Sequence, residues 1–108
     1  MDLPPPQIVC IAQVIQAEAG GESDRGKRAV GHVVLNRAKK SGLTPCQVVR
    51  QPGQFKMKHT GWKGKAFQIA SWLGADPTGG AKYFHSVRVN PRWRYKITTV
   101  IGNHVFYK

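Results

Sequence analysis

The sequence predicts a mainly helical domain of the α+β class, with a small β-hairpin near its C-terminal end. Segments 7–19 and 25–39 repeat apolar residues at the three- and four-residue spacing of amphipathic helices. Segments 97–101 and 104–107 are rich in β-branched and aromatic residues and flank the turn pair Gly102-Asn103. Because 108 residues suffice for one modest core, we expect residues 1–108 to form a single domain, with residues 1–6 as a flexible lead-in.

The two long helices each have recognisable ends. Gly20-Gly21 terminates the first, and either Ser23 or Asp24 can cap the start of the second. Lys39-Lys40 suits the negative end of the second helix dipole. The apolar stripes consist of Ile8, Ile11, Ala12, Ile15 and Ala19 in the first helix, and of Val30, Val33, Val34 and Ala38 in the second.

Two shorter helices and their connections follow. Thr44-Pro45-Cys46-Gln47 has the pattern of a capping box with proline at the first helical position, which predicts a short helix through Val49. We expect residues 51–64 to form a loop, residues 65–73 a fourth helix that ends at Gly74, and residues 76–80 a turn.

The charge of the chain favours a polyanionic partner. Seventeen lysines and arginines against five acidic residues give a net charge of +12, which suits nucleic acid or the anionic bacterial envelope. The absence of a run of 18 apolar residues predicts no membrane span. The N-terminus lacks the features of a secretory signal. We therefore expect either synthesis in the cytoplasm with release by another route, or prior removal of a signal.

The cysteines and histidines do not predict a metal site. Cys10 and Cys46 fit no metal-binding spacing, and we expect buried free thiols, with a single disulfide as the alternative. The four histidines form no HxxxH or HExxH pattern. We accordingly expect no metal and no cofactor.

The carboxylates can be considered one by one, because the chain has only five. Asp2 lies in the tail, Asp24 is explained as a helix cap, and Asp76 precedes a proline in a turn. Glu18 lies between two alanines at the end of an apolar helix, where a raised pKa would keep a proton available for general acid catalysis. The alternative for Glu18 is an ordinary surface glutamate. Glu22 opens the next segment, where it is structural or supports catalysis.

Several segments resemble one known family when they are taken together in order. The resemblance covers nearly the whole chain from residue 8 and is to the SleB-type cell-wall hydrolases, which include spore cortex-lytic enzymes and phage relatives. The matching segments are Ala17-Glu18-Ala19-Gly20-Gly21-Glu22, Ala29-Val30-Gly31-His32-Val33-Val34-Leu35-Asn36-Arg37, Gln51-Pro52-Gly53-Gln54-Phe55, Asp76-Pro77-Thr78-Gly79-Gly80-Ala81 with Tyr83-Phe84-His85, and Ile101-Gly102-Asn103-His104 with Phe106-Tyr107.

The resemblance implies a lysozyme-like fold and cleavage of peptidoglycan between N-acetylmuramic acid and N-acetylglucosamine. It places the catalytic glutamate at Glu18, although the family usually has arginine where this chain has Gly20. It also implies action on the bacterial cell wall, as a phage lytic protein or an exported enzyme. The substrate-binding candidates from the matching segments are Gln54 for an N-acetyl group, Phe55 and Tyr83 for sugar faces, and Thr78 and His85 for the cleft wall.

The shortage of acids favours a one-carboxylate mechanism, as in lytic transglycosylases. Glu18 would protonate the glycosidic oxygen, and the C6 hydroxyl of the muramic acid would attack C1. Hydrolysis by a muramidase, with Glu22 or Asp24 assisting water, is the alternative within this class. A basic nucleic-acid-binding module is the alternative of another class, since basic residues surround Trp62 and Trp93, although no known recognition motif accompanies them. We expect a monomeric enzyme. The basic residues are Lys56, Lys58, Lys63, Lys65, Arg88, Arg92, Arg94 and Lys96.

Overall fold

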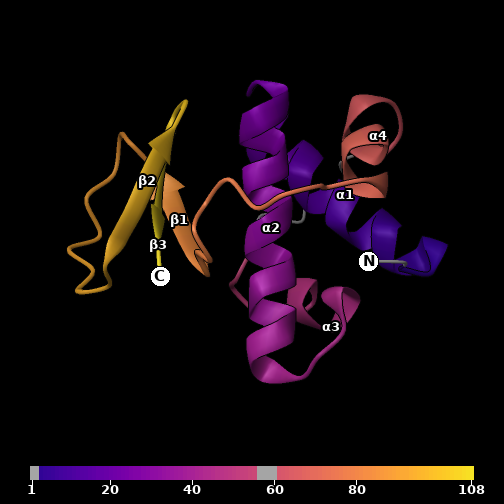
Figure 1. The fold of residues 1–108 in the computed structure, drawn as a ribbon, viewed down its shortest axis with the longest axis horizontal. Coiled ribbons are helices and arrows are strands. Elements are labelled where there is room, and N and C mark those ends of the chain that lie inside the picture. The colour runs from indigo at the N-terminus through magenta and orange to yellow at the C-terminus, as the bar shows by residue number, and fades with distance from the viewer. Residues whose placement is uncertain (1–2, 56–60) are drawn as a thin grey trace.

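The computed structural model describes residues 3–55 and 61–108, so the predictions for Asp2, Lys56 and Lys58 lie outside the described residues. Within these ranges, helices occupy the first two thirds of the chain and a three-stranded antiparallel sheet the last third (Figure 1). The α+β class and the C-terminal hairpin are confirmed. The elements are α1 (Pro5–Ala19), α2 (Asp24–Ser41), α3 (Pro45–Val49), α4 (Lys65–Ser71), β1 (Tyr83–Ser86), β2 (Ile97–Ile101) and β3 (His104–Tyr107).

Most helix ends follow the local chemistry of the sequence, but α4 ends at Ser71, where Trp72 turns to an extended conformation, two residues before the predicted end at Leu73. Helix α1 begins at Pro5, two residues earlier than predicted, because proline is tolerated in the first turn. The Ser23 hydroxyl caps α2 by accepting a hydrogen bond from the Gly26 amide at 3.1 Å. Asp24 is therefore not the cap; it lies in the first turn of α2 and pairs with Lys65 at 3.6 Å. The predicted capping box of α3 is confirmed.

Strand β1 is the one described element that the sequence analysis missed. It pairs antiparallel with β3, which also pairs with β2, so β3 is the central strand of the sheet. All four residues of β1 are half-buried, so they lack the alternation of buried and exposed residues that identifies a strand. Its partner lies about twenty residues later in the chain, and only the folded arrangement brings the two strands together.

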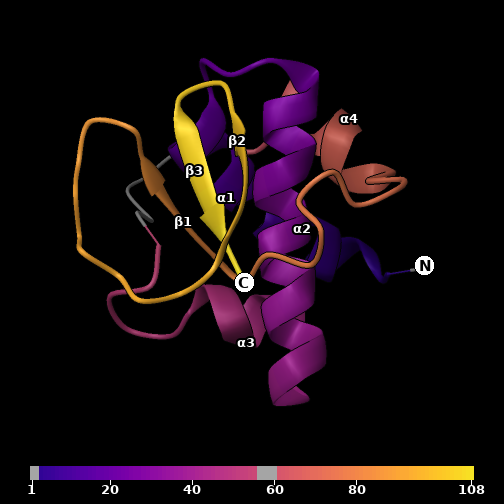
Figure 2. The ribbon, with the colours of Figure 1, turned by 60° about the vertical axis from the view of Figure 1, so that its left-hand side comes forward.

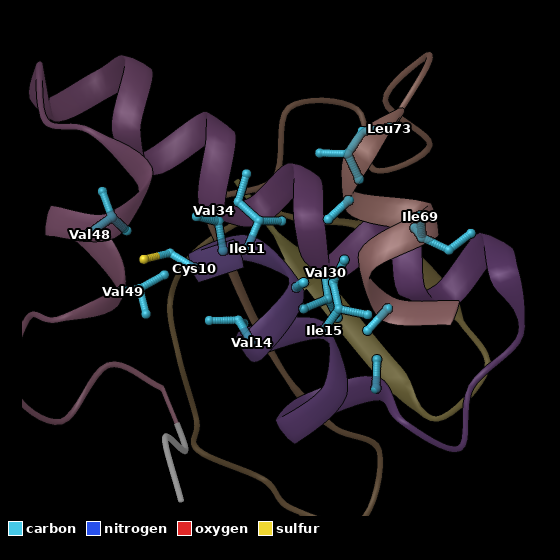
Figure 3. Packing of buried hydrophobic residues seen from close by; sticks show 14 of the residues in the cluster. Cys10, Ile11, Val14, Ile15, Val30, Val34, Val48, Val49, Ile69 and Leu73 are labelled. Carbon is cyan, nitrogen blue, oxygen red and sulfur yellow. The ribbon is translucent and has the colours of Figure 1, made fainter. Parts of the chain in front are cut away.

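Helix α2 is buried on two sides. In Figure 1 it stands between the sheet and the pair α1 and α4, and in Figure 2 it stands between the sheet and α4. Val30 and Val34 pack into the larger hydrophobic cluster with α1, α3 and α4 (Figure 3). Ala29 and Val33 pack against Phe106 in a second cluster beneath the sheet. The helix thus forms the interface between the helical layer and the sheet.

Gly31 allows close packing at the middle of α2. A Cβ atom at this position would lie 2.6 Å from the Leu73 side chain, which is closer than carbon atoms can approach. The neighbouring His32 is buried, and its Nε2 atom lies 3.2 Å from the Leu73 carbonyl oxygen, which can only accept a hydrogen bond. The segment after α4 is therefore held against α2 by both packing and hydrogen bonding.

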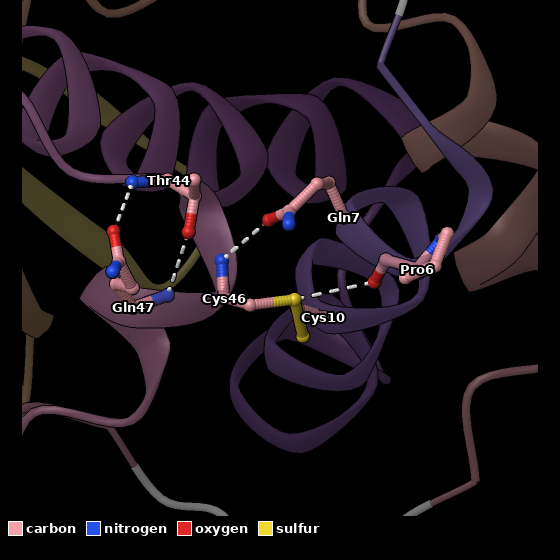
Figure 4. Close-up of a disulfide and its surroundings, with 6 residues drawn as sticks. All are labelled: Pro6, Gln7, Cys10, Thr44, Cys46 and Gln47. Carbon is pink, nitrogen blue, oxygen red and sulfur yellow. Dashed lines mark hydrogen bonds between the residues drawn. A yellow bond between two sulfur atoms is a disulfide. The ribbon is translucent and has the colours of Figure 1, made fainter.

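The expectation of free thiols is wrong, because Cys10 and Cys46 form a disulfide (Figure 4). The bond joins α1 to α3, and the Gln7 side-chain oxygen accepts a hydrogen bond from the Cys46 amide at 2.9 Å beside it. The Cys46 sulfur also lies close to the Pro6 carbonyl oxygen. This contact is not a hydrogen bond, because the sulfur of a disulfide carries no proton. The sequence could not decide the pairing, because the cysteines are 36 residues apart and meet only through helix packing.

None of the helices in the described ranges is long and apolar enough to cross a membrane.

Removal of the disulfide should destabilise the protein substantially. The bond closes a loop with a sequence separation of 36 residues, and its loss from a small domain costs about 2–4 kcal/mol of unfolding free energy. We expect the Cys10→Ser/Cys46→Ser double variant to unfold at a clearly lower denaturant concentration than the oxidised wild type. Reduced wild type should match the variant. Equal stability of all three forms would contradict a structural role for the disulfide.

Candidate active site

Glu18 lies in the last turn of α1, where the chain is about to turn through Gly20-Gly21. Its side chain is half-buried, between Ala17 and Ala19. Burial lowers the pKa of Arg37, and the charge of Glu18 opposes that shift. The carboxyl group at the end of α1 is therefore within electrostatic reach of the guanidinium group on α2.

Arg37 connects the parts of the chain that surround Glu18. Its Nε donates a hydrogen bond to the Lys82 carbonyl oxygen at 2.5 Å, and its Nη1 donates to the Gln54 side-chain oxygen at 3.1 Å. The guanidinium carbon lies 4.7 Å from the centre of the Phe55 ring and 5.2 Å from the centre of the Tyr83 ring. The hydrogen bonds and the two cation–π contacts together hold the planar guanidinium group in one position.

Four of the residues predicted from the sequence are thus gathered around one residue that the sequence analysis had not singled out. Glu18, Gln54, Phe55 and Tyr83 come from α1, the loop after α3, and β1. A signal for Arg37 was present, because Ala29, Val33 and Arg37 follow one another at four-residue spacing. They continue one stripe of α2. A charge on a buried stripe indicates a specific partner.

Thr78, which the sequence analysis proposed for the cleft wall, is buried in the turn before β1. Its side chain is 1% exposed. Its hydroxyl donates to Asp76 Oδ1 at 2.6 Å and accepts from the Ala81 amide at 3.0 Å. Asp76 Oδ2 also accepts from Asn36 on α2 at 3.0 Å. Burial alone would raise the pKa of Asp76, but the hydrogen bonds from Thr78 and Asn36 outweigh burial and lower it.

His85 lies on the face of the sheet that points away from α2, and both of its ring nitrogens have partners. Nδ1 lies 2.7 Å from the Ser86 carbonyl oxygen, which can only accept, so Nδ1 carries a proton. In the neutral ring, Nε2 then accepts a hydrogen bond from the Tyr107 hydroxyl at 2.6 Å. The Trp93 ring meets the His85 ring edge-on at 5.2 Å. His85 therefore packs against the aromatic cluster through Trp93 and is hydrogen-bonded to it through Tyr107.

Glu22 holds the turn between β2 and β3. Its two carboxylate oxygens accept hydrogen bonds from the Asn103 amide at 2.9 Å and from the Asn103 side chain at 3.0 Å. These two bonds lower the pKa of Glu22. Gly102 in this turn has a φ of 56° and lies so close to Glu22 that a Cβ atom would overlap the carboxylate. The loop after α1 and the hairpin turn are thereby joined.

The aromatic cluster on the outer face of the sheet extends from Tyr83. The Tyr95 ring stacks on the Tyr83 ring with centroids 4.3 Å apart and planes 8° from parallel. Trp93 meets the edges or faces of Tyr83, Tyr95 and Tyr107 at centroid distances of 6.3, 5.9 and 5.2 Å. The sequence analysis had noted Trp93 only as part of a nucleic-acid alternative, because its proximity to Tyr83 depends on how residues 87–96 fold back.

A separate hollow of about 480 Å³ lies between α1, α2 and the segment after α4, and it includes none of the residues around Arg37. Among the described residues, no group of histidine, cysteine, aspartate and glutamate side chains is arranged to hold a metal ion. The residues lining the hollow are Leu3, Ile8, His32, Leu35, Asn36, Lys39, Ala70, Ser71, Trp72, Leu73, Gly74 and Asp76.

Comparisons with known proteins identify the fold and the family. The chain is similar to the catalytic domain of the Bacillus cereus SleB protein, with a TM-score of 0.88 and 25% identity over 99% of this chain and 93% of that chain. It is also similar to the catalytic domain of the germination-specific lytic transglycosylase SleB from Bacillus anthracis, with a TM-score of 0.84 and 26% identity over 98% and 97% of the two chains. No protein with a curated description matches the sequence.

The sequence of residues 21–107 matches the cell wall hydrolase family. This range contains Arg37, Gln54, Phe55 and Tyr83, and Glu18 lies just before it. The two structural similarities cover almost the whole chain, so they extend over α1 as well. The fold is therefore lysozyme-like, as the resemblance implied, and the chain belongs to the cell wall hydrolase family.

Proposed function

We propose that the chain cleaves the glycan strands of peptidoglycan between N-acetylmuramic acid and N-acetylglucosamine, as a lytic transglycosylase with Glu18 as its only catalytic carboxyl group. Membership of the cell wall hydrolase family supports peptidoglycan as the substrate. The similar SleB domain from Bacillus anthracis is described as a lytic transglycosylase. The observation that carries the choice of mechanism is the arrangement of the described carboxylates.

Three of the four described carboxylate side chains make contacts that stabilise the fold. Glu22 accepts two hydrogen bonds from Asn103, Asp24 pairs with Lys65 beside the start of α2, and Asp76 holds the turn before β1. Glu18 acts electrostatically on Arg37, whose guanidinium group also contacts two aromatic rings and an amide. This setting suits a carboxyl group that acts on a sugar.

The position of Glu18 suits a residue that first gives and then takes back a proton. The C-terminal end of a helix carries partial negative charge, which favours the protonated form of a carboxyl group there. The positive charge of Arg37 favours the ionised form. The proposed reaction uses both forms of this carboxyl group, the protonated acid in the first step and the carboxylate in the second.

In the proposed reaction, Glu18 protonates the oxygen of the glycosidic bond, and the N-acetylglucosamine leaves as its C4 alcohol. The C6 hydroxyl of the muramic acid attacks C1 and gives its proton to the Glu18 carboxylate. This forms the 1,6-anhydro ring and restores the acid without consuming water. Because the C6 hydroxyl belongs to the same sugar, its attack has an entropic advantage over attack by a separate water molecule.

The residues around Arg37 would hold the sugars. The Gln54 oxygen accepts from Arg37, and the nitrogen of the same amide is a donor suited to an N-acetyl carbonyl group. Phe55 offers a flat apolar surface to a sugar ring, whereas the faces of the Tyr83 ring are covered by Arg37 and Tyr95, so Tyr83 would meet a sugar with its edge or hydroxyl. Arg37 acts as a positioning residue, because it contacts Gln54 and both rings.

Replacement of the proposed acid should abolish lysis without loss of the fold. General acid catalysis contributes roughly 10²- to 10⁴-fold to a rate, so Glu18→Gln should clear purified cell walls at less than about a hundredth of the wild-type rate. Asp24→Asn is the matched control, because it changes an exposed carboxylate nearby in the chain. A Glu18→Gln variant with more than about a tenth of wild-type activity would show that Glu18 is not the acid.

The products distinguish the proposed reaction from hydrolysis by a muramidase. We expect the released fragments to end in 1,6-anhydro-muramic acid, lighter than hydrolytic fragments by the mass of one water molecule. Mass spectrometry before and after borohydride treatment tests this, because borohydride reduces only the free ends that hydrolysis creates. Muramitol as the main product would assign the chain to the muramidases instead.

Glu22→Gln should change stability, and its pH dependence, more than catalysis. The pKa of Glu22 is lowered in the folded protein, so its stabilising effect is complete above the ordinary value of 4.5 and is lost as the pH falls through the lowered folded value. In denaturant unfolding, the unfolding free energy of the wild type should therefore decrease below about pH 4.5. The decrease should be smaller for the Glu22→Gln variant. If Glu22→Gln abolished lysis at unchanged stability, Glu22 would be a catalytic group.

A further inference from the structure

The segment 87–96 between β1 and β2, here called the aromatic arm, has features that the proposed reaction does not use. It runs along the side of the sheet that faces away from α2 (Figure 1). Near its ends the arm is hydrogen-bonded to the segments beside β3: the Val87 amide donates to the carbonyl oxygen of Asn103 in the turn before β3, and the amide of Lys108, just after β3, donates to the Lys96 carbonyl oxygen. The middle of the arm rests on the sheet through the rings of Trp93 and Tyr95.

The arm continues the group of flat side chains that begins at Phe55. Arg37 contacts both Phe55 and Tyr83, and Tyr95 stacks on Tyr83 at 4.3 Å. The series Phe55, Arg37, Tyr83, Tyr95 therefore leads without interruption from the surroundings of Glu18 onto the arm.

The two aromatic residues of the arm are fixed in place yet remain open to solvent. Trp93 is 38% exposed and Tyr95 is 47% exposed, although each ring contacts several others. Arg92, next to Trp93, has a φ of 55°, the one positive value among the described residues other than glycine. Such a backbone conformation is unfavourable for arginine and is typical of functional segments. An ordered, exposed aromatic surface of this kind indicates a binding surface.

We propose that the aromatic arm binds the glycan strand of peptidoglycan beyond the two sugars at the cleaved bond, with sugar rings against Tyr95 and Trp93. This inference rests on the proposed function. Pyranose rings present C–H groups on their faces, and these groups pack well against rigid aromatic rings. The arm also has four basic residues and no acidic residue, which suits the carboxylates of the stem peptides attached to the strand. Those residues are Arg88, Arg92, Arg94 and Lys96.

Rings and positive charges also occur together in proteins that bind single-stranded nucleic acid. The stack that joins the arm to the residues around Glu18 favours the glycan, because one strand can occupy both places at once. Nucleic acid is accordingly one of the outcomes that the experiment distinguishes.

The test measures binding of glycan strands of graded length to the protein with Glu18→Gln, which prevents cleavage if the proposed reaction is right. Strands freed of stem peptides still carry the lactyl carboxylate of each muramic acid, so binding is measured at high salt, which screens the charges and isolates the effect of the rings. Affinity should rise with strand length, and Trp93→Ala or Tyr95→Ala should weaken binding of long strands by about tenfold while leaving the shortest strands unchanged. Tyr95→Phe, which keeps the ring, should bind as the parent does. Trp72→Ala is the control, because Trp72 is 79% exposed at the separate hollow.

The outcomes separate the two proposals. Equal loss for all strand lengths, or no loss for any, would overturn the role of the arm whatever the reaction is. Tighter, Trp93-dependent binding of single-stranded DNA than of glycan would also overturn it, in favour of nucleic acid. Product analysis with the protein that retains Glu18 tests the reaction independently. A failure there, with length-dependent glycan binding intact, would reject the catalytic proposal and leave the arm as a glycan site.

Discussion

The structure depends on one helix that must be buried from two sides. Small and β-branched residues of α2 fill both faces, so that α1 and α4 can pack on one side and the sheet on the other. Gly31 allows the closest of these approaches. A single helix buried on both sides can position groups from every layer, because residues on its surface are fixed relative to all of its neighbours.

Arg37 shows how the fold uses this position. It continues the stripe of α2 that packs beneath the sheet, but it ends in a charged planar group. Its hydrogen bonds and ring contacts join the loop that carries Gln54 to the start of β1. Glu18 comes to the same place from the end of α1. Burying such a charge is costly unless it is paired, and these contacts offset that cost while they organise the site.

Two other polar clusters hold the ends of the sheet. Asp76 and Asn36 attach the turn before β1 to α2, and Glu22 attaches the hairpin turn to the segment after α1. In both, hydrogen bonds lower the pKa of the carboxyl group, so each remains ionised and is a poor proton donor near neutral pH. The same physical effect therefore stabilises the fold and removes these carboxylates as candidates for the catalytic acid.

The sequence alone determined the four helices, the hairpin and the family resemblance, because these depend on patterns within short segments: apolar spacing, caps and turn residues. The sequence also directed attention to Glu18 by elimination among so few acids. Only the tertiary structure decided the pairing of Cys10 with Cys46, the addition of β1 to the sheet, and the burial of Thr78. It also decided that Arg37, Tyr83 and Tyr95 form one stack. Each of these features requires contact between residues far apart in the chain, and such contacts arise only when the helices and the sheet pack together around α2.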